Sequence, residues 1–410
     1  MGRSRDKLIR VAFFDEAVAF GGSVVVLSNL LQHIDRTRFD PLVVTSLDEQ
    51  SIDQLFRPSD ILVRFRPKLD YSDRIRWMAK LAITTPQLKR IGAYCFSTIA
   101  FISNLPAHLQ LYFKIWRAKP DLIHLNNGRE ALIAARLLRI PLLVHLHGFA
   151  PEMLTGRHGQ IAHARLFISI SKYISDQVLA TGVNRDRLLD IANPAPDRRP
   201  RIISRRQWQE RYSLPERSVV FAHVARLIRW KGQLEFLEAF ALVSHQLPEA
   251  YALIVGDDVE GFSHEYPRQL REFVLSRGIG GKVVFAGHVS EVLELMAFSD
   301  VVVHSSIDPE PFGLVITEAM TAGTAIIAAR LGAPIELIVD GKTGLLVDPK
   351  NTTEFASAIA RLATNEDLRH KLGAAAREDA RERFSPDAFA RRMEDAYLKA
   401  MQPEAKGRVN

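Results

Sequence analysis

The sequence predicts an α/β protein built from two doubly wound parallel sheets, and three observations support this. Short apolar runs of strand length alternate with helical patterns in both halves of the chain, as repeated strand–helix–strand units require. Most of these runs lack polar alternation, which indicates strands that are buried on both faces. A Pro-rich, charged stretch at 193–200 interrupts the alternation once, and 410 residues suffice for two domains.

We therefore predict a first domain over 1–195, a second over 201–383 and a closing amphipathic helix over 384–402. The expected strands of the first domain are 8–14, 41–46, 61–65, 120–125, 141–147, 166–170 and 188–192. Those of the second domain are 218–224, 251–256, 282–286, 301–303, 324–329 and 339–347. Glycine, serine or proline near several strand ends marks the turns into the helices.

The composition favours a protein of a reducing compartment. Its single cysteine, Cys95, excludes an internal disulfide. The N-terminus is charged where a secretory leader would have an apolar core. We therefore expect a cytoplasmic protein, with peripheral docking on the inner face of the plasma membrane as an open option.

The positive charge of the chain is concentrated in a basic-aromatic region at 64–119. This region has eleven Lys and Arg against two Asp, a net charge of +9, while the whole chain carries +7. Such a surface implies an anionic partner, but no recognition motif supports nucleic acid. The uncharged run 91–107 is near the lower limit for a membrane span, and Asn104 and Pro106 weaken that interpretation. A buried helix and an interfacial surface on an anionic membrane are the other interpretations.

In the first domain, two strand ends have residues suited to a ligand site. Gly21 and Gly22 open the first helix, and paired glycines allow a backbone to approach a ligand closely. A tight turn with a capped helix is the plain alternative. His147 ends the strand 141–147, at the edge where open α/β sheets bind ligands, whereas His124 and His145 are expected to be structural.

In the second domain, two further strand ends carry candidate ligand residues. Arg226 and Lys231 follow the strand 218–224, and both cations suit a diphosphate. Gly287 and His288 follow the strand 282–286 and are expected at the same edge of the sheet.

The stretch 305–323 is the most informative part of the sequence. Its two prolines hold Glu310 in an extended loop, and a helix follows from Phe312 to about Ala322. The first free N–H groups would come from Phe312, Gly313, Leu314 and Val315. Such a helix start binds anions, typically phosphate. Glu310 and Glu318 beside it are better suited to accept hydrogen bonds from sugar and ribose hydroxyls, unless both are merely solvated in an ordinary strand–loop–helix.

This stretch resembles the Glu-X7-Glu signature of retaining GT-B glycosyltransferases, particularly glycosyltransferase family 4. The resemblance extends over Ser-x-x-x-Pro-Glu-Pro-Phe-Gly-Leu-x-x-x-Glu-Ala-Met at 305–320 and Arg-Leu-x-x-x-Lys-Gly at 226–232. It covers the second domain almost throughout and the first in scattered places. Ala333 departs from the pattern, because it replaces a glycine that is frequent in that loop of the family.

The resemblance implies a GT-B fold, with two Rossmann-like domains facing across a cleft and a C-terminal helix that crosses back to the first domain. It implies that Glu310 holds the donor sugar, that Glu318 binds the ribose, and that Arg226 and Lys231 stabilise the leaving diphosphate. His147 would contact a sugar hydroxyl, and Gly21-Gly22 would face the diphosphate.

The implied function is a retaining hexosyltransferase of EC class 2.4. It would move a sugar from a nucleoside-diphosphate sugar to a glycan or lipid-linked acceptor in cell-surface polysaccharide or glycolipid biosynthesis. The sequence has no Asp-X-Asp pair and no cluster with metal-ligand spacing, so we expect neither a metal nor a cofactor. Two alternatives stay open: a sugar epimerase or hydrolase on the same fold, and a non-catalytic module that binds anionic surfaces.

Overall fold

The computed structural model describes residues 8–16, 21–65, 86–127, 130–148, 164–258 and 265–402. These residues form two compact units. Unit 1 draws on Met1–Leu146, Pro151–Ile168 and Met393–Asn410, and unit 2 on His147–Ala150 and Ser169–Arg392. The domain boundaries expected near 195, 201 and 383 do not coincide with these limits and stay predictions.

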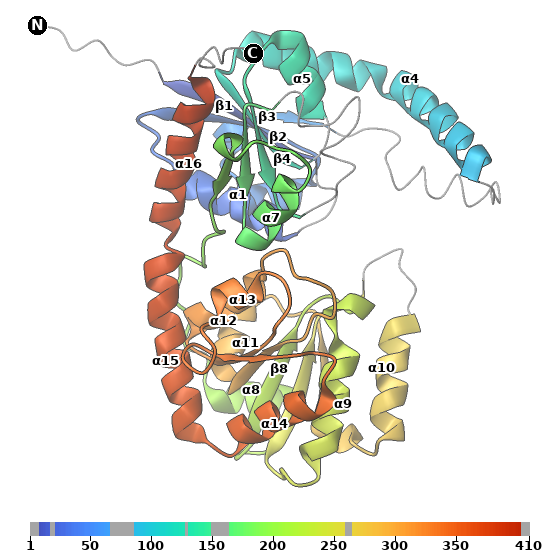
Figure 1. Ribbon diagram of the computed structural model, residues 1–410, viewed down its shortest axis with the longest axis vertical. Helices are drawn as coiled ribbons and strands as arrows, with labels where there is room; N and C mark the ends of the chain where they lie inside the picture. The colour runs from blue at the N-terminus through green and yellow to red at the C-terminus, as the bar shows by residue number, and fades with distance from the viewer. Residues whose placement is uncertain are drawn as a thin grey trace, which may run out of the picture. The chain divides into compact units, whose positions relative to one another are not determined.

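A first sheet of seven strands has the order β3-β2-β1-β4-β5-β6-β7 (Figure 1). Its strands are β1 (Ile9–Asp15), β2 (Phe39–Thr45), β3 (Ile61–Arg64), β4 (Leu122–Asn127), β5 (Leu142–Leu146), β6 (Leu166–Ser169) and β7 (Leu188–Asp190). Neighbouring strands from β3 to β5 pair in parallel. Successive residues of β1, such as Phe13 and Phe14, are fully buried, as expected for a sheet with both faces covered.

A second sheet of six parallel strands has the order β10-β9-β8-β11-β12-β13. Its strands are β8 (Val219–Val224), β9 (Ala250–Val255), β10 (Val283–Gly287), β11 (Val301–His304), β12 (Ala325–Ala329) and β13 (Leu345–Val347). Alternate residues of β8 enter different cores: Phe221 packs in one cluster with Phe236 and Phe355, and Val220 in another with Trp208. This division explains the continuous apolar runs of the sequence.

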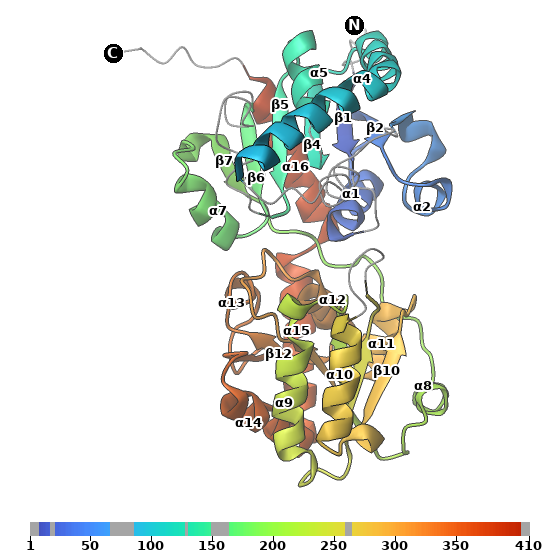
Figure 2. The same ribbon diagram turned by 90° about the vertical axis from the view of Figure 1, so that its right-hand side faces the viewer.

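Helices connect these strands. The helices from α1 to α7 are α1 (Gly22–His33), α2 (Glu49–Leu55), α4 (Pro86–Ala118), α5 (Glu130–Leu138) and α7 (Lys172–Leu179). The later helices are α8 (Arg205–Tyr212), α9 (Gln233–Ser244), α10 (Glu265–Ser276), α11 (Val292–Phe298), α12 (Leu314–Ala322), α13 (Pro334–Leu337), α14 (Thr352–Ala363), α15 (Glu366–Arg383) and α16 (Pro386–Met401). Figure 2 shows α9 and α10 side by side on one face of the second sheet.

The C-terminal helix crosses back as the sequence predicts. From Met393 onward, α16 belongs to unit 1. The hydroxyl of Tyr397 lies 2.8 Å from Nδ1 of His124 on β4, and the Tyr397 ring packs against Phe13 and Phe39. Glu394 accepts a hydrogen bond of 2.8 Å from the Asp35 N–H. The second half of α16 therefore completes the core of unit 1.

The basic-aromatic region is described only from Pro86 onward, where one helix, α4, runs through Pro106. Arg74, Arg76 and Lys80 lie outside the described residues. Figure 1 shows the N-terminal half of α4 projecting away from the first sheet. No helix within the described ranges is long and apolar enough to cross a bilayer.

Candidate active site

The strand order of the second sheet places its ligand-binding edge between β8 and β11. The chain moves outward from β8 through β9 to β10 and then returns to β11 on the other side. Ligands of open parallel sheets bind at this reversal, beyond the carboxyl ends of the strands. Lys231 follows β8 and Glu310 follows β11, and Lys231 Nζ lies 2.7 Å from Glu310 Oε2. The structure thus brings together two of the predicted site residues.

Glu310 is held through one of its two carboxylate oxygens. Oε2 accepts hydrogen bonds from Lys231, from Ser306 Oγ at 2.9 Å and from His304 Nε2 at 3.2 Å. Burial alone would raise the pKa of Glu310, but the His304 hydrogen bond and the charge of Lys231 outweigh it and lower the pKa from 4.5 to about 2. Oε1 accepts no hydrogen bond from the described part of the chain. The site therefore holds an ionised carboxylate with one oxygen available to a ligand.

The loop that carries Lys231 is fixed by buried polar groups. Ser305 Oγ donates to the Gly232 carbonyl at 2.7 Å and lies 2.9 Å from His223 Nε2. Burial lowers the pKa of His223 from 6.5 to about 3, so its ring is neutral at pH 7. Gly232 has a φ of +73°, and a Cβ there would lie 1.8 Å from the Ser305 carbonyl oxygen. The glycine after Lys231 is thus required by close backbone packing.

Helix α12 begins two residues later than the sequence predicts, at Leu314, because Gly313 adopts a φ of +101° and precedes it as the N-cap. The backbone N–H groups of Phe312, Gly313, Leu314 and Val315 donate no hydrogen bond to the described residues. Glu310 pairs by backbone with Gly332, where a Cβ would lie 2.6 Å from the Glu310 carbonyl oxygen. The helix start therefore offers unpaired donors directly after the Glu310 loop, as an anion site requires.

Glu318 lies one turn inside α12 and is partly buried. Its carboxylate accepts no hydrogen bond from the described part of the chain. Burial raises its pKa from 4.5 to about 7. A desolvated carboxylate without a donor is suited to accept hydrogen bonds from the hydroxyls of a ligand.

The other predicted donor-site residues of the second sheet also lie at strand ends. The His288 N–H donates to Asp257 Oδ2 at 3.0 Å, and the Gly256 N–H donates to the Gly287 carbonyl at 2.8 Å. The Leu227 N–H, next to Arg226, donates to the Asp257 carbonyl at 2.9 Å. The Arg226 side chain is exposed and has no hydrogen bond or ion pair within the described residues. Asp257 joins these loops and was not predicted from the sequence.

The first sheet has its own reversal, between β1 and β4. Asn126 Nδ2 on β4 donates to Asp15 Oδ2 at 2.7 Å and to the Ser23 carbonyl at 3.2 Å. Gly21 is the N-cap of α1 and accepts from the Val24 N–H at 3.1 Å, in extended backbone. The described structure therefore confirms the turn at Gly21-Gly22, whereas its contact with a donor stays a prediction.

His147 lies directly after β5, which ends one residue before the strand end that the sequence predicts. Burial lowers the pKa of its ring from 6.5 to about 3, so it is neutral at pH 7. A neutral imidazole can both donate to and accept from a sugar hydroxyl. Its role toward a donor sugar stays a prediction.

Two family profiles match the chain over most of its length. "Glycosyltransferase Family 4" matches residues 20–199 and "Glycosyl transferases group 1" matches residues 204–379. The chain belongs to the family 4, group 1 glycosyltransferases. Among relatives of this glycosyltransferase, the Bacillus anthracis N-acetyl-alpha-D-glucosaminyl L-malate synthase is 29% identical over 50% of this chain and 51% of its own length. A Mycobacterium tuberculosis GDP-mannose-dependent alpha-(1-6)-phosphatidylinositol monomannoside mannosyltransferase is 30% identical over 53% and 54%.

These alignments span about half the length of each relative. Solved structures show the likeness of the whole fold. Anabaena HepE, crystallised with UDP and glucose, aligns with a TM-score of 0.74 over 95% of this glycosyltransferase and 99% of that chain, at 23% identity. A Rickettsia africae glycosyltransferase aligns with a TM-score of 0.77 over 97% and 100%, at 18% identity. The chain therefore has the two Rossmann-like domains of the GT-B fold.

Three residues of this glycosyltransferase that hold its candidate site were not predicted: His304 and Ser306, which contact Glu310, and His223, which contacts the Lys231 carbonyl. His304 ends β11 and Ser306 lies in the stretch 305–323, so both precede Glu310 closely in the sequence. Their contact with Glu310 depends on the path of the loop between them, which turns the Glu310 side chain back toward β11. Within the described ranges, no group of three or more His, Cys, Asp or Glu residues is arranged to hold a metal ion.

Proposed function

We propose that this glycosyltransferase transfers a hexose from a nucleoside-diphosphate sugar to a glycan or lipid-linked acceptor, with retention of configuration and without a metal. The observation that carries the proposal is the pairing of Glu310 with Lys231 at the reversal of the second sheet, directly before the open N-terminus of α12. This arrangement provides an acceptor for a sugar hydroxyl beside donors and a cation for phosphate oxygens.

In the proposed reaction, the protein stabilises charge that grows on the leaving diphosphate. The N–H groups at the start of α12 and the positive end of its dipole face that charge, together with Lys231 and the unpaired Arg226. Glu310 Oε1 accepts from a hydroxyl of the donor sugar while Oε2 stays fixed. Glu318 accepts from the ribose, and His147 contacts a sugar hydroxyl. These fixed groups supply the electrostatic stabilisation that a divalent ion provides in other transferases.

The known proteins support the classes of donor and acceptor. HepE has been crystallised with UDP and with UDP-glucose, and the mycobacterial relative depends on GDP-mannose and acts on a phosphatidylinositol mannoside. A lipid-linked or glycan acceptor in cell-surface polysaccharide or glycolipid biosynthesis is consistent with both.

A panel of nucleotide sugars in excess EDTA tests the proposal. We expect one donor to raise the unfolding temperature, because a ligand at 100 times its dissociation constant adds about 2.7 kcal/mol of stability. With an acceptor, the same donor should release nucleoside diphosphate at an unchanged rate in EDTA, and the product should keep the anomeric configuration of the donor. Loss of activity in EDTA that Mg²⁺ or Mn²⁺ restores would refute metal independence.

The same panel separates the two other functions. Consumption of the nucleotide sugar without an acceptor would indicate hydrolysis or epimerisation at the same carboxylates. Release of no nucleoside diphosphate with any acceptor, together with binding to anionic surfaces, would indicate a non-catalytic module.

The raised pKa of Glu318 predicts that donor binding strengthens as the pH rises through about 7. Ribose hydroxyls donate to the ionised carboxylate, so the protonated form must first lose its proton in order to bind. Calorimetry with a nucleotide sugar should show a dissociation constant that falls from pH 6 to pH 8, by up to about tenfold per pH unit below the pKa. In Glu318→Gln this dependence should disappear. A parent protein with pH-independent affinity would contradict the role of Glu318.

A second proposal, docking on an anionic membrane, is favoured by an apolar face of α4. Ile102, Leu105, Leu109, Phe113 and Trp116 are spaced three or four residues apart, and all are exposed. The opposite face buries Leu111 and Ile115. Because each Lys or Arg close to an anionic leaflet adds about 1 kcal/mol, the basic residues of this region would reinforce such docking.

Vesicle sedimentation tests the docking. We expect the protein to pellet with phosphatidylglycerol vesicles but not with phosphatidylcholine vesicles, less so at high salt because charges are screened beyond about 8 Å at physiological ionic strength. Replacement of Leu109, Phe113 and Trp116 by Ser should reduce the bound fraction at least tenfold. Leu242→Ser, at a similarly exposed residue of α9, is the matched control. Equal pelleting of the triple variant and the parent would rule out the α4 face.

A further inference from the structure

A second basic site lies at the C-terminal end of α12, on the segment that leads from 195 to 200. A cavity of about 540 Å³ is lined there by that segment, by Thr321 on α12, by α15 and by the start of α16. Four of its lining residues are arginines, Arg198, Arg199, Arg377 and Arg381, and one is acidic, Asp197. The volume lies within the range of roughly 300–1,000 Å³ that is usual for small-molecule sites.

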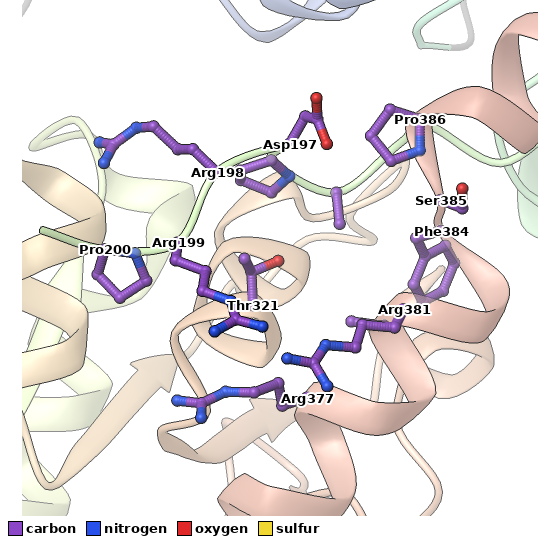
Figure 3. A pocket seen from close by; sticks show the side chains of 13 residues that line it. Asp197, Arg198, Arg199, Pro200, Thr321, Arg377, Arg381, Phe384, Ser385 and Pro386 are labelled. Atoms are coloured by element: carbon purple, nitrogen blue, oxygen red, sulfur yellow. The ribbon is translucent and has the colours of Figure 1, made fainter.

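Two of these arginines have structural partners. Arg198 forms a bidentate ion pair with the buried Glu294, at 2.6 and 3.1 Å, and Figure 3 shows its side chain pointing away from the other arginines. Arg377 donates to the Ala322 carbonyl and so satisfies the C-terminal end of α12. Arg377 is therefore needed for the fold, although its side chain also lines the cavity.

The other two arginines of the cavity have no comparable structural partner within the described residues. Arg199 is exposed and has no hydrogen bond or ion pair within the described residues, and Arg381 has one weak, exposed contact of 3.4 Å with Glu378. Figure 3 shows Arg199 and Arg381 reaching from opposite sides of the cavity toward Thr321 and Arg377. Arg199 and Arg381, beside Arg377 and with a single lining carboxylate, Asp197, leave a net positive cavity. Like charges placed together repel unless an anion joins them.

Neutral groups in the same cavity can also bind oxygen atoms. Ser385 Oγ accepts from the Ala388 N–H at 3.4 Å and retains its own proton for donation. Pro386 begins α16, so the positive end of a sixteen-residue helix adjoins the cavity. The Ala195 N–H donates to the Phe384 carbonyl at 2.9 Å, which fixes two walls of the cavity against each other.

We infer that this cavity, called the arginine pocket, binds a soluble phosphorylated small molecule through Arg199, Arg377 and Arg381. Guanidinium forks match the oxygens of phosphate, and a multiply charged group suits three of them. The cavity is larger than one phosphate group, which leaves room for a small organic part such as a sugar. This site is separate from the proposed donor site, because its walls contain none of Arg226, Lys231 and Glu310.

Calorimetric titration of Lys231→Met protein, which lacks a cation of the donor site and so binds anions more weakly there, tests the arginine pocket. The probes are inorganic phosphate, pyrophosphate and glucose 1-phosphate at constant ionic strength. We expect pyrophosphate and glucose 1-phosphate to bind, and the additional pair Arg199→Ala with Arg381→Ala to weaken them at least tenfold. Arg206→Ala with Arg268→Ala, at exposed helical arginines paired with Glu210 and Glu272, should have no effect.

Three results would overturn the inference. The first is equal affinity with and without Arg199 and Arg381, which would place the anion elsewhere. The second is no binding of any of the three probes. The third is binding only to vesicles that contain phosphatidic acid, because the ligand would then be a lipid headgroup. Since both arginines are exposed, an unchanged unfolding temperature of the unliganded double variant serves as the folding control.

Discussion

Glu310→Gln is expected to reduce kcat by about 10²–10³-fold, or roughly 2.7–4 kcal/mol of transition-state stabilisation. Three donors, Lys231, His304 and Ser306, converge on Oε2 of Glu310. The amide oxygen of the substituted side chain must occupy that position to satisfy them. Its NH₂ group then replaces Oε1, so a donor faces the sugar hydroxyl where an acceptor is required.

Steady-state kinetics of nucleoside diphosphate release, with the donor identified by the panel, measure this effect. Glu235→Gln is the matched control, because Glu235 is also largely buried and ion-paired, with Arg229, but does not contact Glu310. We expect its kcat to stay near that of the parent. Near-normal turnover of Glu310→Gln in a folded protein would remove Glu310 from the active site.

Lys231→Met is the second large effect, with an expected loss of at least about 10²-fold in kcat/KM. Methionine keeps the unbranched stem but removes the ammonium group, which lies 2.7 Å from Glu310 and 3.9 Å from the centre of the Trp230 ring. Arginine should not rescue the variant, because its longer planar fork does not fit the place of a compact charge. Lys350→Met, at an exposed loop lysine, is the control.

The pH dependence of stability provides an independent readout of the same ion pair. The folded pKa of Glu310, about 2, lies below its ordinary value of 4.5, so its interactions stabilise the fold above pH 4.5 and this stabilisation is lost as the pH falls toward 2. Lys231→Met removes part of it. We expect the difference in unfolding temperature between parent and variant to be largest from pH 5 to pH 7 and to shrink toward pH 3. A constant difference would show that the charge of Glu310 does not depend on Lys231.

The sequence was sufficient to predict which edge of the second sheet carries the candidate site. Each predicted strand of the second sheet has an observed counterpart in β8 to β13, and the residues after the strands are therefore predictable as neighbours. This works because parallel strands with continuous apolar runs must be buried, and their carboxyl ends must then share one edge. The start of α12 was placed two residues too early, because a glycine with positive φ can cap a helix without any side-chain signal.

What the sequence by itself determined is that Lys231 follows one buried strand, and that Glu310 and the helix carrying Glu318 follow another. Only the tertiary structure decided which of them touch. It showed Lys231 on Glu310, with His304 and Ser306 on the same oxygen, and it left Glu318 without a donor. It also placed Arg199 in the wall of one cavity with Arg377 and Arg381, both of which lie more than 170 residues later in the chain. The physical reason is that strand and helix patterns are local, whereas side-chain contacts depend on loop paths set by close packing, as at Gly232 and Gly332.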